Sequence, residues 1–134
     1  MTSYLLDTCI CIDLIRGRAP QAVRRLRRRR IGTVGISSIT FAELQYGVAR
    51  SSDPTRNTIA LAHFCAPFDI LPFDQEAASD YGAIRADLER SGTPIGPLDT
   101  LIAAHARALG AVLVTSNERE FARVGRLRIE NWGA

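Results

Sequence analysis

Short apolar segments alternate with longer amphipathic ones along the chain, and this alternation constrains the fold more than any other feature. The segments between the apolar ones repeat their apolar residues at helical spacing. Strands that alternate with helices pair in parallel through crossover connections, and the helices then cover both faces of the sheet. The pattern predicts an α/β domain with a central parallel sheet of four to five strands flanked by helices. The expected strands are residues 4–7, 33–37, 68–71, 111–115 and 127–130.

The helical segments carry recognisable start and stop signals. Ser37 or Ser38 is expected to cap the helix that follows the second strand, and Gly17, Gly92 and Gly110 stand where helices should end. The last long helix has an apolar stripe that is predicted to face the core, formed by Leu98, Leu101, Ile102, His105 and Leu109. The segment DLIRG and the arginine-rich residues 24–30 fill the gap before the second strand. Longer helices are expected at residues 38–50, 55–65, 74–89 and 98–109.

The length of 134 residues predicts one domain, residues 1–134, that buries a core without disulfides. The three cysteines, Cys9, Cys11 and Cys65, have no CxxC spacing, so we interpret them as small hydrophobic residues. No apolar stretch approaches the roughly 20 residues that span a bilayer, and the first residues lack the pattern of a signal peptide. We therefore expect a cytoplasmic protein without a membrane segment.

All 17 cationic side chains are arginine, and the net charge is +3. Six of these arginines lie in the run RRLRRRR at residues 24–30. Because the guanidinium fork suits phosphate, a nucleic-acid partner is one interpretation of this run. A solvated helix face is the other, and the sequence alone leaves both open.

Acidic residues follow the expected strands from three separate crossovers. Asp7 ends the first strand, Glu43 lies early in the helix after the second, and Asp99 lies in the first turn of the helix that enters residues 111–115. Each has a simpler explanation, because Asp7 can cap a helix and the other two favour a helix dipole. Independent capping does not predict three carboxylates at one edge of a parallel sheet, which is the edge where ligands bind.

Carboxylates that converge at one edge repel one another unless a cation lies between them. Oxygen ligands of this kind suit Mg²⁺ or Mn²⁺, which retain waters and bind substrate phosphate. Such an ion generates hydroxide or stabilises a leaving oxygen, so the chemistry that fits is phosphodiester hydrolysis. The segment VTSNEREF adds Asn117, Glu118 and Glu120 at the same edge.

Three long segments resemble the PIN-domain proteins, and more closely the VapC toxins of bacterial type II toxin–antitoxin pairs. They are YLLDTCICIDLIRG, SSITFAELQYG and IRADLERSGTPIGPLDTLIAAHARALGAVLVTSNEREFARVGRLRIENW. The resemblance covers nearly the whole chain and agrees in motif identity, order and spacing. It implies a Mg²⁺- or Mn²⁺-dependent endoribonuclease with a small α/β fold and a parallel central sheet.

The resemblance also implies which residues form the site. The acidic quartet of the family carries over to Asp7, Glu43 and Asp99, which are expected to be both catalytic and metal-binding. Many members have an aspartate near Asn117, whereas those with an NxxEF pattern place the acid at Glu120, which we predict to be the fourth residue. An amide is no general base, so Asn117 is expected to support the site, together with Thr8 and Thr115. Arginines expected to bind RNA are Arg16, Arg85 and Arg119.

The family implies partners as well. They are an RNA substrate, a VapB-type antitoxin that inserts into the acidic groove, and a second copy of the chain in a homodimer. Sequences with the IGPLDxLIAAHA and TSNxxEF patterns are similar to members that cut initiator tRNA in its anticodon loop. Initiator tRNA is therefore the expected substrate on similarity alone.

Other functions fit the sequence less well. A phosphoacceptor receiver domain needs a lysine, and the chain has none. A P-loop enzyme needs GxxxxGK[ST], which does not occur. His105 lies on an apolar stripe and is expected to be a core residue. The alternative that stays open is a catalytically inactive PIN-like module that only binds its antitoxin or RNA, because Asn117 stands where many members have an acid.

Overall fold

The computed structural model describes residues 1–133. It contains one parallel five-stranded sheet with the strand order β3-β2-β1-β4-β5. The strands are β1 (Tyr4–Leu6), β2 (Val34–Ser37), β3 (Asp69–Leu71), β4 (Val112–Val114) and β5 (Ile129–Glu130). The helices are α1 (Thr8–Ile15), α2 (Pro20–Arg27), α3 (Ser38–Ala49), α4 (Pro54–Cys65), α5 (Gln75–Arg90), α6 (Pro97–Leu109) and α7 (Glu118–Phe121).

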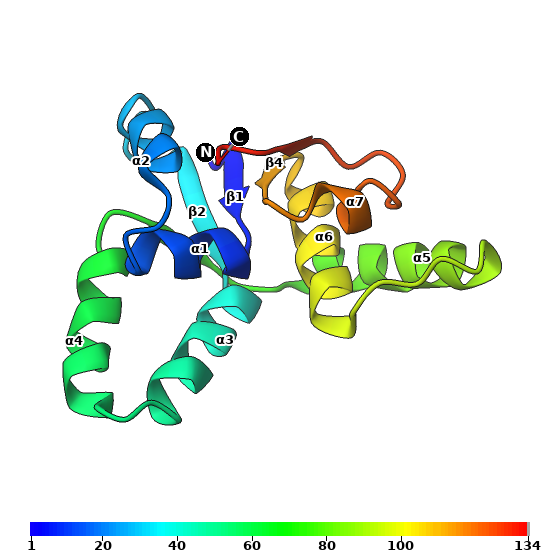
Figure 1. The fold of residues 1–134 in the computed structure, drawn as a ribbon. Coiled ribbons are helices and arrows are strands. Elements are labelled where there is room, and N and C mark those ends of the chain that lie inside the picture. Colours follow the sequence, from blue (N-terminus) through cyan, green and yellow to red (C-terminus); the bar gives the residue numbers. More distant parts are fainter. Residues whose placement is uncertain (134) are drawn as a thin grey trace.

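Helices cover both faces of the sheet, as the alternation of segments predicted. Leu5 and Leu6 are fully buried and point to opposite faces, because successive residues of a strand alternate. Leu6 packs with residues of α1, α2, α3 and α4, whereas Leu5 packs with residues of α5, α6 and α7. Figure 1 shows these two groups of helices on opposite sides of β1. The central strand is thus anchored on both faces just before Asp7.

All five expected strands are present, although each is one or two residues shorter than predicted. The four long helices begin and end within one residue of their expected bounds. Gly17, Gly92 and Gly110 have φ values of 70°, 68° and 68°, so they end helices as predicted. The short helix α7 was not predicted. Its four residues are too few to show helical periodicity in a sequence.

Two expectations about burial are wrong. Leu98 is 45% exposed, because it stands in the first turn of α6, which extends beyond the packed core. Cys9 is also exposed, whereas Cys11 and Cys65 are buried. Cys9 is the second residue of α1. No helix among residues 1–133 is both long enough and apolar enough to cross a bilayer.

An ion pair fixes α6 against α5. Arg107 donates from Nε and Nη2 to the two carboxylate oxygens of Asp80, at 2.8 and 2.6 Å, and from Nη1 to the carbonyl of Gly125. These hydrogen bonds, more than any other effect, lower the pKa of the Asp80 carboxyl. Because α6 also carries Asp99, this pair helps to set the position of an expected site residue.

Candidate active site

The register of the two central strands brings Asp7 and Thr115 together. Leu6 of β1 lies opposite Val114 of β4, so the next residue of each strand emerges at the same edge of the sheet. The Thr115 hydroxyl donates a short hydrogen bond to Asp7 Oδ2, while Asp7 Oδ1 accepts from the backbone N–H of Ile10 at 2.9 Å. Asp7 therefore caps α1, as one interpretation of the sequence had it, and still faces the sheet edge.

The Asp7 side chain is buried, with 3% of its surface exposed. Burial is the main cause that raises the pKa of its carboxyl, and the nearby charges of Asp13 and Glu43 act in the same direction. The hydrogen bonds from Thr115 and Ile10 oppose this rise. A buried carboxylate with acidic neighbours is a site that a cation stabilises.

Glu43 reaches the same region from α3. This helix begins at a capping side chain, because Ser37 Oγ accepts from the backbone N–H of Ile39 at 3.0 Å. The buried His105 forms a 2.7 Å hydrogen bond with the same Ser37 hydroxyl, which confirms that His105 is a core residue. Glu43 lies farther along α3, and its Oε1 accepts from the Thr8 hydroxyl at 2.7 Å. The hydrogen bond ties Glu43 to the start of α1, directly after Asp7.

Asp99 and Glu120 form the other half of the acidic group. Asp99 stands in the first turn of α6 and Glu120 in α7, and their side chains share a hydrogen bond. The pKa of Asp99 is raised to about 6, first by burial, then by the charge of Glu120 and its hydrogen bond, and further by Asp7 and Glu43. Asp99 therefore holds a proton to a higher pH than a free aspartate does.

Asn117 orients Glu120 in this structure. Its amide Nδ2 donates to Glu120 Oε2 at 2.8 Å, and its backbone N–H donates to the Thr115 hydroxyl oxygen at 2.9 Å. Because the side-chain N–H group donates to the carboxylate, Asn117 acts here as a hydrogen-bond donor. The carboxylate beside Asn117 belongs to Glu120, and its role as the fourth site residue stays a prediction.

One neutral donor accompanies each of three carboxylates in the acidic group. Thr8 donates to Glu43, Thr115 to Asp7 and Asn117 to Glu120. Asp99 differs, because its only recorded side-chain partner among residues 1–133 is the carboxyl group of Glu120. The three residues that the sequence predicted as supporting groups are therefore in contact with the acidic ones. We call the four acidic residues the carboxylate cluster: Asp7, Glu43, Asp99 and Glu120.

The carboxylate cluster does not form a closed metal cage. Within residues 1–133, no three His, Cys, Asp or Glu side chains lie close enough together to hold a metal ion as they stand. The donor set nevertheless suits a hard divalent cation, because it offers only carboxylate oxygens. A cation would offset the burial and the acidic neighbours that raise the pKa of Asp99 to about 6.

The sequence did not single out two residues beside the cluster. Asp13, on α1, contributes to the raised pKa of Asp7. The Cys9 thiol has its pKa raised to about 11, first by burial and then by the charges of Asp7, Asp99, Asp13 and Glu43. Acidic groups from three elements thus raise the pKa of one thiol. The only signal for Asp13 was its spacing of six residues from Asp7, which is too weak to identify a site.

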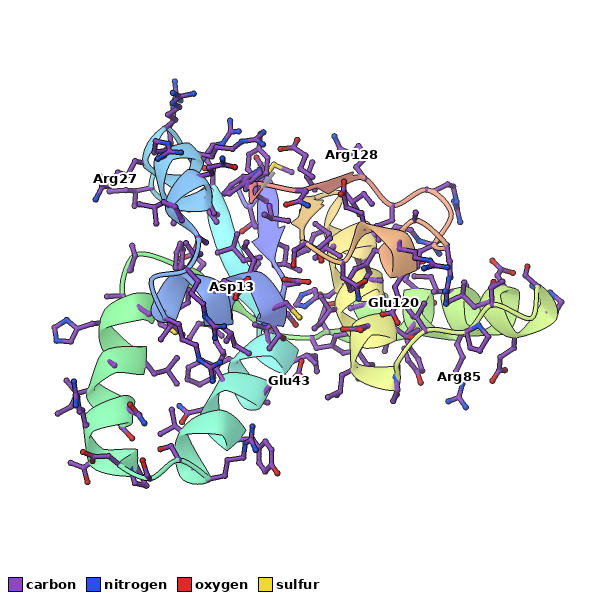
Figure 2. The ribbon with its side chains drawn as sticks, viewed as in Figure 1. Asp13, Arg27, Glu43, Arg85, Glu120 and Arg128 are labelled. Atoms are coloured by element: carbon purple, nitrogen blue, oxygen red, sulfur yellow. The ribbon has the colours of Figure 1, made fainter. Side chains whose placement is uncertain are left out.

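The three arginines expected to bind RNA lie in different surroundings. Arg16, after α1, shares with Glu43 a cleft of about 530 Å³ between α1, α3 and α4. Arg85 pairs with Glu89 and Tyr81 on α5, and Figure 2 shows it extending away from Glu120. Arg119 is exposed on α7, next to Glu120. Only Arg16 shares a cleft with a member of the carboxylate cluster, and RNA binding by all three stays a prediction.

Comparison with known proteins identifies relatives along nearly the whole chain. The PIN domain family matches residues 4–127. The tRNA(fMet)-specific endonuclease VapC of Shigella flexneri is 46% identical over 132 residues, covering 98% of this chain and 99% of the relative. A ribonuclease VapC of Haemophilus influenzae is 42% identical with the same coverage. The crystal structure of DNA-bound VapBC from Salmonella typhimurium superposes with a TM-score of 0.93 at 42% identity, covering 98% of this chain and 99% of that one.

Proposed function

The chain belongs to the PIN-domain family, and we propose that it is the endoribonuclease toxin of a VapBC-type toxin–antitoxin pair. The observation that carries this proposal is the carboxylate cluster, in which acidic residues from four separate elements meet at the carboxyl edge of the sheet. The two VapC relatives named above are an endonuclease and a ribonuclease. The match covers almost their full length, which supports the same activity. The pKa values of Asp7 and Asp99 are raised by burial and by acidic neighbours, and perturbed groups of this kind are typical of catalytic sites.

Asp7, Glu43, Asp99 and Glu120 are the residues that would hold Mg²⁺ or Mn²⁺. The bound ion supplies charge neutralisation at the phosphate and an activated water. The protein's own contribution is to position the ligands: Thr115 orients Asp7, Thr8 orients Glu43 and Asn117 orients Glu120. Asp99, whose pKa is raised to about 6, would bind the ion in its deprotonated form, so metal binding would favour loss of its proton.

The proposed substrate class is RNA, with initiator tRNA as the specific expectation. The matched endonuclease of Shigella flexneri is specific for tRNA(fMet), which supports this choice. The proposed protein partner is a VapB-type antitoxin, since the matched solved structure is a VapBC complex. A homodimer and a cytoplasmic location complete the proposal and rest on the family resemblance.

Metal removal tests the activity. We expect the purified protein, freed of antitoxin, to cut a tRNA transcript in the presence of Mg²⁺ or Mn²⁺ and to leave it intact in EDTA. Adding back the ion should restore cleavage, because hydrogen bonds from Thr115 and Thr8 hold Asp7 and Glu43 without the ion. Gel analysis of end-labelled RNA measures both states. Intact RNA in every metal condition, together with normal antitoxin binding, would support the inactive binding module instead.

Substitutions of Glu120 and Asn117 test which of the two is the fourth residue of the site. Glu120→Gln is expected to lower the cleavage rate by about 100-fold or more, because it removes a ligand. Asn117→Ala is expected to cost about 10- to 100-fold, because it removes only the donor that orients Glu120. Single-turnover cleavage of the same RNA measures both. A larger loss from Asn117→Ala than from Glu120→Gln would move the essential role to Asn117.

A further inference from the structure

Helix α2 and the three residues after it carry two kinds of arginine, and one kind holds this segment to the rest of the protein. The guanidinium of Arg29 lies 4.6 Å from the ring centre of Tyr4 and 5.3 Å from that of Trp132. Arg25 lies 5.8 Å from the Trp132 ring and also contacts Glu130 and the carbonyl of Asn131. These two arginines are half-buried and stack on aromatic rings, so their role is structural.

The other kind faces solvent. Arg24, Arg27, Arg28 and Arg30 are exposed, and we call these four residues the arginine patch. Residues 14–42 contain no aspartate or glutamate, and none of the four takes part in a salt bridge recorded for residues 1–133. An unpaired group of like charges attracts a polyanion, because binding releases the counterions that it otherwise holds.

A separate groove lies between α1 and the start of α2. It has a volume of about 340 Å³, and its lining includes Asp13, Arg18, Pro20 and Ser116. Ser116 directly follows Thr115, which donates to Asp7. In Figure 2, Asp13 lies between Arg27 and Glu43, and Arg27 stands well apart from Glu43 and Glu120. Arg27 of the arginine patch is thus remote from these two members of the carboxylate cluster.

We propose that the arginine patch binds the phosphate backbone of a folded RNA outside the segment that is cut. This inference rests on the proposed ribonuclease function. The carboxylate cluster repels phosphate until cations neutralise it, so a separate cationic surface gives the RNA a place to bind first. A phosphate contact carries no base specificity, so the arginine patch raises affinity and orients the RNA without choosing the sequence.

The test compares two variants that each lose three positive charges. The patch variant is Arg24→Gln, Arg27→Gln and Arg28→Gln, and the control variant is Arg90→Gln, Arg126→Gln and Arg128→Gln, which are exposed arginines elsewhere. Binding of a tRNA transcript is measured in EDTA as a function of salt. Cleavage is measured with Mg²⁺ or Mn²⁺, on the transcript and on a short single-stranded oligonucleotide that carries the cut sequence. Circular dichroism checks that all variants fold.

The patch variant is expected to bind the tRNA transcript at least about tenfold more weakly at 0.1 M salt and to reduce the salt slope by about 2 to 3. Its cleavage of the short oligonucleotide should equal that of the wild type, because the oligonucleotide does not reach the patch. Equal tRNA binding by the patch and control variants would overturn the proposal. So would an equal loss on tRNA and oligonucleotide, or a loss of antitoxin binding with RNA binding unchanged.

The binding measurement separates this proposal from the ribonuclease function. If the wild type cuts neither RNA, the proposed activity fails. Salt-dependent binding in EDTA still decides whether the arginine patch holds RNA, because it requires no turnover.

Discussion

Replacing Asp7 with asparagine is expected to lower RNA cleavage by at least about 100-fold and to leave the fold intact. The loss follows because Asp7 supplies a buried charge at the centre of the carboxylate cluster, and even residues that only orient ligands are worth about 10- to 100-fold. The fold should persist because asparagine is as good a helix cap as aspartate, so the bond from the Ile10 N–H is retained. Single-turnover cleavage and thermal unfolding measure the two effects.

Asp74→Asn is the matched control for this variant. Asp74 caps α5 as Asp7 caps α1, because its Oδ1 accepts from the backbone N–H of Ala77 at 3.0 Å. It is exposed, and it does not contribute to the raised pKa of Asp7 or Asp99. We expect Asp74→Asn to cut RNA at the wild-type rate. Antitoxin binding by Asp7→Asn should also be normal, and a loss of binding or folding would mean that Asp7 is primarily structural.

Replacing Asp99 with asparagine should abolish cleavage and yet stabilise the metal-free protein at neutral pH. The pKa of Asp99 is raised from 3.8 to about 6, so between these pH values the folded state holds a proton that the unfolded state has lost. The free energy of unfolding therefore falls as pH rises through this range. After allowance for solvent screening, we expect Asp99→Asn to restore about 1 kcal/mol at pH 7, or about 3 °C in Tm.

The pH dependence distinguishes this effect from a general change in packing. At pH 4, where the wild-type Asp99 is protonated in the folded state, the variant and the wild type should have similar Tm values in EDTA. Glu76→Gln serves as the control, because Glu76 is an exposed acid in the first turn of α5. That change should slightly lower Tm, since it removes a charge that favours the helix dipole. A lower Tm for Asp99→Asn at pH 7 would contradict the account of a repulsive cluster.

The sequence predicted the part of the site that follows from topology. A parallel sheet brings the carboxyl ends of its strands to one edge, so the positions of Asp7 and Thr115 followed from recognising two strands. The residues Thr8, Thr115 and Asn117 were expected as supporting groups, and each donates to a carboxylate. The simpler interpretation of Asp7 as a helix cap was correct too, because one oxygen caps α1 while the other accepts from Thr115.

Other features depend on side-chain directions that a sequence pattern does not contain. The contact between Asp99 and Glu120 depends on how the unpredicted helix α7 packs near the start of α6. Helical periodicity placed Leu98 in the core, but its side chain is 45% exposed in the first turn of α6. In the sequence, residues 24–30 form one basic run. In the structure, Arg25 and Arg29 differ from the others, because they stack on aromatic rings from distant parts of the chain.

The most direct test of the central claim is to sequence the ends of all cellular RNAs after the chain is expressed without an antitoxin. A carboxylate-dependent ribonuclease should produce new RNA ends in cells that express the wild type. These ends are expected at one or a few positions in the anticodon loop of initiator tRNA. Cells that express Asp7→Asn should lack those ends at equal protein level. Identical RNA ends in both cultures, with growth inhibited in both, would contradict a carboxylate-dependent ribonuclease.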